Sequence, residues 1–202
     1  MARWNEENAV CWSCGSNEWH RTMWLFLSRI EPELVSGAGS LLHFAPEPGI
    51  ERLLRPQITH YVSADIDPGV ADVAVDITNM QFDDGSFDAT ICSHVLEHVP
   101  DDAAAMSELY RVLRPGAWAL VLVPLDRERD ETLEDPSITD PEARKWVFWQ
   151  EDHVRLYAAD IADRLRVPGF EVEHLRPALP PAEAERYRLG DRNDLFLCRK
   201  PG

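Results

Sequence analysis

The sequence predicts an α/β fold in which a mainly parallel sheet is covered by helices on both faces. Two observations support this prediction. From residue 40 onward, short apolar segments of strand character alternate with segments of helical periodicity. Parallel strands need crossover connections of this kind, so the alternation favours a sheet with a helix layer on each side. The length of 202 residues suits one domain with a substantial core.

The elements follow one another in a regular order. Residues 102–113 begin with acidic side chains and are followed by Arg-Pro-Gly, the polarity expected of a helix with a stop signal. The last two strands are separated by a proline-rich segment, and we expect them to pair antiparallel. The predicted strands are 40–44, 60–65, 73–77, 87–93, 118–124, 170–175 and 193–199, and the helical segments are 50–55, 102–113 and 158–167. The domain therefore spans 40–202, with an N-terminal segment (1–39) and an insertion (125–150).

Charge, apolar runs and cysteine content disfavour several classes of function and location. The net charge of −16 disfavours a nucleic-acid partner. The longest apolar run, 117–125, is too short to cross a bilayer, so we expect no membrane association. The first residues lack the pattern of a secretory signal, and we expect a cytoplasmic protein. The four cysteines do not form a disulfide framework.

Polar side chains follow successive predicted strands, where open α/β sheets bind their ligands. Asp65 ends the second strand and is placed to accept hydrogen bonds from ribose hydroxyls. Asp76 ends the third and suits an adenine amino group, with Ile77 beside the ring. The fourth strand ends in "CSHVLEHV". An acid after a strand is often only a turn former, but the series together predicts a site for an adenosine-containing cofactor.

The first strand ends in "HFAPEPG", a turn that suits few such cofactors. Pro46 and Pro48 lack an N–H group, and Glu47 adds a negative charge, so the loop disfavours the pyrophosphate of NAD or FAD. S-adenosylmethionine has no phosphate and carries a sulfonium and an ammonium group. An acidic loop with few donors fits it.

The segments "DGSFDATICSHVLEHV" and "ELYRVLRPGAWALVLVP" resemble the class I S-adenosylmethionine-dependent methyltransferases, in particular the methyltransferase type 11 group. The resemblance covers about 40–124 strongly and 150–199 more weakly. It implies a Rossmann-like, seven-stranded sheet of order 3-2-1-4-5-7-6 with the last strand antiparallel. It also implies that the N-terminal segment and the 125–150 insertion form a lid over the active site.

The first family motif departs from its usual form, an acid and an apolar residue before Gly-x-Gly-x-Gly. His43 stands at the acid position, Ala45 and Glu47 replace two glycines, and Gly49 is kept. We hypothesise that Glu47 supplies the missing carboxylate; alternatively it points to solvent. The cofactor contacts implied by the resemblance are His43, Phe44, Ala45, Pro46, Glu47, Gly49, Asp65, Ile66, Asp76, Ile77, Ser93 and His94.

Three histidines are candidates for a general base: His94, His98 and His153. His98 has a structural alternative at a helix start, and His153 has one beneath the lid. Tyr157 is a further candidate for orienting the acceptor. The linear spacing of these residues does not suggest a metal-dependent methyltransferase, and we expect no metal there.

The N-terminal segment contains Cys11-x-x-Cys14 and several tryptophans. With His20 the cysteines offer three zinc ligands, whereas structural zinc sites need four. The tryptophans of this segment and of the insertion form either an acceptor pocket or a packed lid or dimer contact. They are Trp4, Trp12, Trp19, Trp24, Trp146 and Trp149.

The sequence thus predicts an S-adenosylmethionine-dependent methyltransferase. We expect it to act on an oxygen or nitrogen atom of a small metabolite or natural-product intermediate, or of a peptide or saccharide. A catalytically inactive subunit with the same fold is the alternative, favoured by the altered first motif. A homodimer is possible on either interpretation.

Overall fold

The computed structural model describes residues 10–177, 179–190 and 194–202. Its main sheet has seven strands in the order β3-β2-β1-β4-β5-β9-β8. The strands β1 to β5 are parallel, and β9 runs antiparallel to both of its neighbours, β5 and β8. The bounds are β1 (Ser40–Phe44), β2 (His60–Asp65), β3 (Val73–Ala74), β4 (Phe87–Ser93), β5 (Leu113–Leu122), β8 (Glu171–Leu175) and β9 (Leu195–Arg199). The predicted order and the antiparallel last strand are confirmed.

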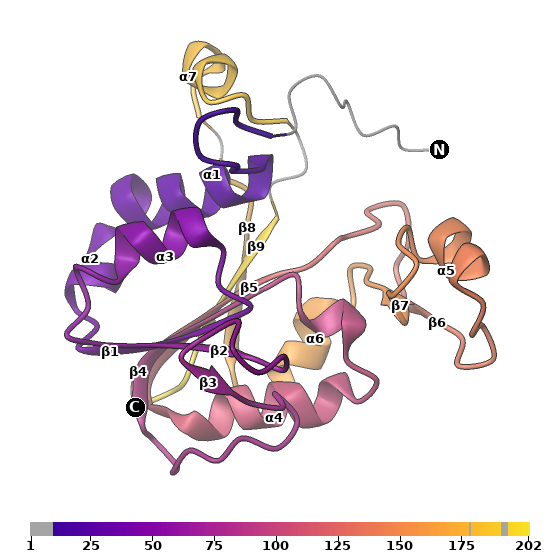
Figure 1. Cartoon of the computed structure of the whole chain (residues 1–202), viewed down its shortest axis with the longest axis horizontal. Helices are drawn as coiled ribbons and strands as arrows, with labels where there is room; N and C mark the ends of the chain where they lie inside the picture. Colours follow the sequence, from indigo (N-terminus) through magenta and orange to yellow (C-terminus); the bar gives the residue numbers. More distant parts are fainter. Residues whose placement is uncertain (1–9, 178, 191–193) are drawn as a thin grey trace.

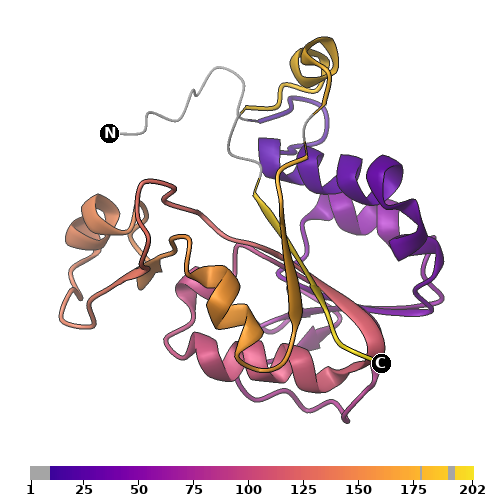
Figure 2. The same ribbon diagram turned by 180° about the vertical axis from the view of Figure 1, so that it is seen from behind.

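Helices cover the sheet on both faces, as predicted (Figure 1). One face carries α1 (Glu18–Leu25), α2 (Pro32–Ser36) and α3 (Pro48–Leu54), with a π-helical turn, Phe26–Ile30, between the first two. The other face carries α4 (Asp102–Val112) and α6 (Ile161–Arg166). The view from behind shows the same two layers (Figure 2).

Each face of the sheet has its own apolar core, and β5 shows how one strand serves both. Trp118 and Leu120 face the core beneath α1, α2 and α3, whereas Ala119 and Val121 face the core beneath α4 and α6. Alternation of this kind follows from the period of two in a strand. Because both faces are buried, the strand reads as the continuous apolar run seen in the sequence.

Local signals explain the limits of the elements. At the start of α4, Asp101 accepts a hydrogen bond from the Ala104 N–H at 2.9 Å, a normal N-cap. The predicted strand 73–77 is shorter than expected, because the chain turns at Asp76, whose Oδ1 accepts the Thr78 N–H at 2.8 Å. The predicted strand 118–124 begins earlier, at Leu113, with a register shift against β4. Position 193 of the last predicted strand lies outside the described residues.

Two additions flank the sheet. α7 (Pro181–Arg186) lies next to α1 (Figure 1), and Arg21 of α1 donates a hydrogen bond to the Tyr187 carbonyl at 2.7 Å. The 125–150 insertion contains β6 (Leu133–Glu134) and α5 (Pro141–Val147), and β6 pairs with β7 (Arg155–Leu156). This second unit projects from the side of the sheet (Figures 1 and 2).

Across the part of the chain that the structure describes, none of the helices combines the length and the apolar character needed to cross a membrane.

Candidate active site

The carboxyl ends of β1 and β4 form the switch point of the sheet, because the chain continues from them toward opposite edges. Ligands of open α/β sheets bind at such a point. The residues that follow these strands, Ala45 and His94, both have left-handed backbone, with φ of 44° and 54°. Left-handed residues other than glycine are uncommon and gather at functional sites, so this switch point is the candidate active site.

Glu47 turns back toward the end of β1. It occupies the N-cap position of α3, yet its side chain does not cap the helix. Its carboxylate lies 2.9 Å from Nε2 of His43 and 3.6 Å from Nε2 of His20, and the side chain is 12% exposed. The alternative in which Glu47 simply points to solvent is therefore wrong. A carboxylate therefore lies directly beside position 43, as the hypothesis that Glu47 replaces the missing acid requires.

His43 is fully buried and links Glu47 to β2. A carboxylate only accepts hydrogen bonds, so Nε2 of the His43 ring donates to Glu47, while Nδ1 lies 2.6 Å from the Tyr61 hydroxyl. Burial raises the pKa of Tyr61, which keeps this hydroxyl protonated. The predicted contact of His43 with the cofactor stays a prediction; in the structure this side chain holds Glu47, through a chain that begins at Tyr61.

The environment keeps Glu47 ionised. Burial acts to raise the pKa of Glu47, but the hydrogen bond and charge of His43 outweigh it, and the pKa lies below its ordinary value. Burial lowers the pKa of His20, which Glu47 offsets only in part. At neutral pH the ionised Glu47 carboxylate therefore lies next to the neutral imidazole of His20.

The acids after β2 and the 73–77 segment are preorganised by local hydrogen bonds. Asp65 accepts the Asp67 N–H at 2.9 Å through Oδ1. Asp76 is exposed, and the bond from the Thr78 N–H lowers its pKa. Ile66 is 70% exposed, whereas Ile77 and Phe44 are buried in the core on the α4 side. Side-chain carboxylates thus stand at three successive strand ends, at Glu47, Asp65 and Asp76.

A second group of side chains follows β4 on the 3₁₀ turn η3 (Leu96–His98). Oε1 of the buried Glu97 lies 3.1 Å from Nδ1 of His94. Three potential ligand atoms lie within 4.8 Å of one another, one each from Glu97, His98 and His153. The fold therefore gathers all three predicted histidines around one buried carboxylate.

Comparison with known proteins agrees with this geometry. Residues 48–121 match a family described as "Methyltransferase domain". Over 55 residues the chain is 44% identical to the 2-phytyl-1,4-naphtoquinone methyltransferase of Nostoc punctiforme, a match that covers 27% of this chain and 24% of that protein. The aligned part thus spans about a quarter of that curated relative.

Solved structures share the fold at low sequence identity. One is the complex between the Haloferax volcanii Trm112 methyltransferase activator and a putative methyltransferase, with a TM-score of 0.63, 18% identity, and 92% of this chain and 90% of that chain covered. Another is the N-methyltransferase NodS of Bradyrhizobium japonicum in complex with S-adenosyl-L-homocysteine, with a TM-score of 0.56, 15% identity, and 98% and 96% covered.

Residues 48–121 match the methyltransferase-domain family, and the fold of the chain is shared with solved methyltransferases. The sheet order of this chain and its antiparallel β9 are those that the resemblance to class I S-adenosylmethionine-dependent methyltransferases implied. The side chains at the strand ends fit the family's cofactor, because Glu47 places a carboxylate after β1. This charge would repel a phosphate but attracts the positive groups of S-adenosylmethionine.

Tyr157 lies in the apolar core and not at the surface of the switch point. Its ring is fully buried, and its hydroxyl donates to Oδ2 of Asp102 at 2.8 Å. This placement indicates a structural role, in place of the predicted role in orienting an acceptor.

Helix α1 contacts residues of the switch point at two places. The ring of Trp19 lies 4.8 Å from that of His94, between centroids, and His20 approaches Glu47. Trp12 and Trp146 are exposed, at 102% and 71%, so these two do not enclose a pocket in this structure. Trp4 lies outside the described residues. We retain the lid as a proposal for α1.

The thiols of the N-terminal turn sit at the surface. Cys14 is exposed, and its sulfur lies 3.2 Å from the Ser16 hydroxyl oxygen. The pKa of Cys14 is lowered, because the Ser16 hydroxyl can donate a hydrogen bond to the thiolate. His20 is engaged by the Asn17 N–H at 3.0 Å through Nδ1.

Sequence inspection missed two residues of this site. Tyr61 carries no motif, and it becomes visible only through its contact with His43. Glu97 stands within "VLEHV", but the sequence directs attention to the histidines on either side of it. Its burial, at 1% exposure, is the signal that marks it.

Proposed function

We propose that this chain binds S-adenosylmethionine at the carboxyl ends of β1, β2 and β3 and transfers its methyl group to a small-molecule acceptor. The observation that carries the proposal is the ionised, mostly buried carboxylate of Glu47 at the switch point. The name of the Nostoc relative specifies a small-molecule substrate, which supports an acceptor of this class over a peptide or saccharide.

Three carboxylates have distinct roles in cofactor binding on this proposal. Glu47 pairs with a positive charge of the methionine end. Asp65, fixed by the Asp67 N–H, accepts hydrogen bonds from the ribose hydroxyls. Asp76 accepts from the adenine amino group, with its orientation held by Thr78. Charge-assisted hydrogen bonds of this type are roughly twice as strong as neutral ones.

When bound, the cofactor supplies an electrophilic methyl group for in-line displacement. The chain contributes orientation, which is worth about 7–11 kcal/mol in well-positioned reactions. His94 is our candidate for the general base. Glu97 accepts from Nδ1–H of His94 and so leaves Nε2 of the neutral ring with a lone pair for an O–H or N–H proton. Trp19 fixes the plane of this ring from α1.

Calorimetric titration tests the proposal. We expect S-adenosylmethionine and S-adenosylhomocysteine to bind at micromolar concentration, with no heat from NADH, whose pyrophosphate Glu47 repels. Formation of S-adenosylhomocysteine with a panel of hydroxyl and amine acceptors then tests turnover. Binding without turnover on any acceptor would favour the inactive subunit, and the absence of binding would refute the cofactor assignment.

A further inference from the structure

We propose that Glu97, His98 and His153 form a binding site for a divalent transition-metal ion, of which Zn²⁺ is the best match. One ligand atom from each residue lies within 4.8 Å of the others. Glu97 and His153 are 1% and 4% exposed, while the His98 side chain is 32% exposed. The group is thus closed on the protein side and open to solvent at His98.

The carboxylate of Glu97 gives an independent indication of a cation. Oε1 accepts from His94, but Oε2 is buried and has no hydrogen-bond partner among the described residues. A buried carboxylate oxygen without a partner is costly, and native structures rarely keep one without a function. A metal ion between the carboxylate and the two imidazoles would satisfy it.

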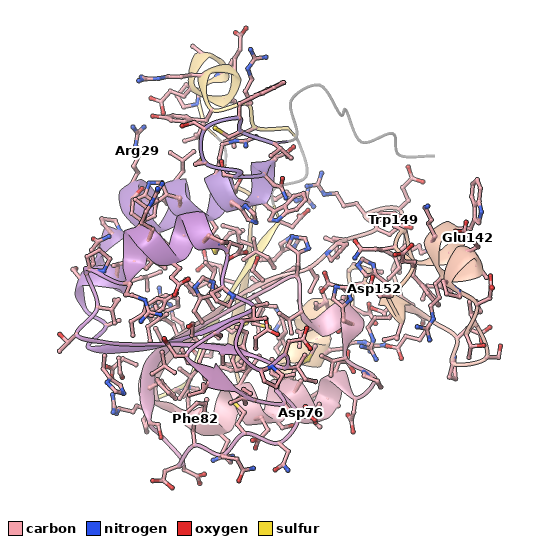
Figure 3. All side chains as sticks on the ribbon, in the orientation of Figure 1. Arg29, Asp76, Phe82, Glu142, Trp149 and Asp152 are labelled. Atoms are coloured by element: carbon pink, nitrogen blue, oxygen red, sulfur yellow. The ribbon has the colours of Figure 1, made fainter. Side chains whose placement is uncertain are left out.

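The histidines are held as metal ligands usually are. Nδ1 of His153 donates to the Phe148 carbonyl at 2.8 Å, so Nε2 of the ring carries the lone pair. Asp152, which is labelled in Figure 3, lies 3.3 Å from Nδ1 of His98 and is an orienting carboxylate for the second imidazole. Partners of this kind fix ring orientation in metal sites.

The two segments that carry the ligands are tied firmly together. Arg155 is buried and donates to the carbonyls of Leu96, Val99 and Pro100, which lie in and after η3. The Val154 N–H also donates to the Glu97 carbonyl at 2.9 Å. The three side chains are therefore preorganised, which a site of defined geometry requires.

The donor set selects the class of ion. Two imidazole nitrogens and one carboxylate oxygen suit zinc and similar ions, whereas Mg²⁺ and Ca²⁺ prefer oxygen ligands throughout. Three protein ligands leave a coordination position for water or a substrate atom, as in catalytic zinc sites. If the proposed methyl transfer holds, the ion would bind an acceptor oxygen beside His94 and lower the pKa of its hydroxyl.

Direct metal titration tests the site without the cofactor, so its failure is distinct from a failure of the proposed function. The chain, carrying no polyhistidine tag and stripped with a chelator, is titrated calorimetrically with Zn²⁺ and with Co²⁺. We expect one ion per chain. His153→Gln and Glu97→Gln each weaken binding by about 100-fold or more, because loss of even an orienting partner costs 10–100-fold.

Two controls separate this site from other ligands in the chain. His60→Gln removes an exposed histidine at the start of β2 and leaves binding unchanged. The double variant Cys11→Ser/Cys14→Ser also binds normally. Loss of binding in the cysteine variant, no binding by the natural chain, or unchanged affinity in Glu97→Gln would overturn the proposal.

A measurement on the natural chain guards against variants that misfold. Zn²⁺ should shift the imidazole NMR resonances of His98 and His153 and leave those of His60 and His174 in place. Thermal melts of each variant without metal establish that it is folded. Shifts confined to other histidines would equally refute the site.

Discussion

Replacement of Glu47 by Gln tests the central element of the cofactor site. The amide keeps the size of the side chain and removes its charge, which His43 stabilises from 2.9 Å. We expect weaker binding of S-adenosylmethionine. A hydrogen bond to a charged group contributes about 1.5–3 kcal/mol, and each 1.4 kcal/mol is a factor of ten. The dissociation constant should therefore rise about 10- to 140-fold.

Two ligands identify which charge Glu47 meets. S-adenosylmethionine and S-adenosylhomocysteine both carry the ammonium group, but only the former has the sulfonium. An equal loss for both ligands places Glu47 against the ammonium. A larger loss for S-adenosylmethionine indicates the sulfonium instead.

Calorimetry supplies the measurement, and Glu51→Gln is the matched control. Glu51 lies one helical turn further along α3 and pairs with Arg55 at the surface, at 2.6 Å. Its loss should leave the cofactor affinity within twofold of the natural chain, since a surface pair contributes about 1 kcal/mol or less even to stability. An unchanged dissociation constant in Glu47→Gln, with the fold intact by thermal melt, would refute our assignment.

Three further predictions concern cofactor contacts, stability and pH. Asp65→Asn should weaken cofactor binding by about tenfold or more through loss of a charged acceptor, whereas the control Asp67→Asn should not. Equal effects of the two variants in calorimetry would refute the proposed hydrogen bonds from the ribose hydroxyls to Asp65. Arg155→Met should lower the free energy of unfolding by about 3–5 kcal/mol, because Arg155 is 3% exposed and joins two segments; Arg166→Met, at an exposed pair with Asp163, should cost less than about 1 kcal/mol in urea denaturation. Burial holds the pKa values of His20 and His153 below the ordinary value of about 6.5, so the unfolded chain binds these protons first and stability should fall as pH drops below about 6.5. Urea melts in chelator at pH 7.5 and pH 5.5 measure this loss, which the double variant His20→Gln/His153→Gln should reduce; an equal loss in both proteins would contradict the assignment.

The sequence determined the fold to a large extent. The alternation of strands and helices is local, and burial on both faces of the sheet makes residues 117–122 of β5 a continuous apolar run that is easy to find. The order of the strands followed from the family resemblance, because pairing between distant strands leaves no local signal. The limits of β3 and β5 were less well predicted, since a turn at Asp76 and a register shift after Leu113 set them.

The candidate site also has one part that the sequence predicts and one part that depends on packing. Glu47, Asp65 and Asp76 follow strands directly, so their presence at one edge of the sheet could be predicted from their positions. The sequence left the direction of Glu47 open. Only the packing of β2 beside β1 brings Tyr61 to His43, and that contact orients the His43 ring toward Glu47. The Glu47 side chain therefore bonds to His43 instead of pointing to solvent.

Tertiary structure alone decided the second cluster. His153 is more than fifty residues from Glu97 and His98 along the chain, and β7 returns it to η3 through the bonds made by Arg155 and Val154. Tyr157, two residues further on than Arg155, is drawn into the core by Asp102 instead. Linear spacing carries no information on such contacts, because they depend on how segments distant in the chain pack and on which polar groups burial forces to find partners.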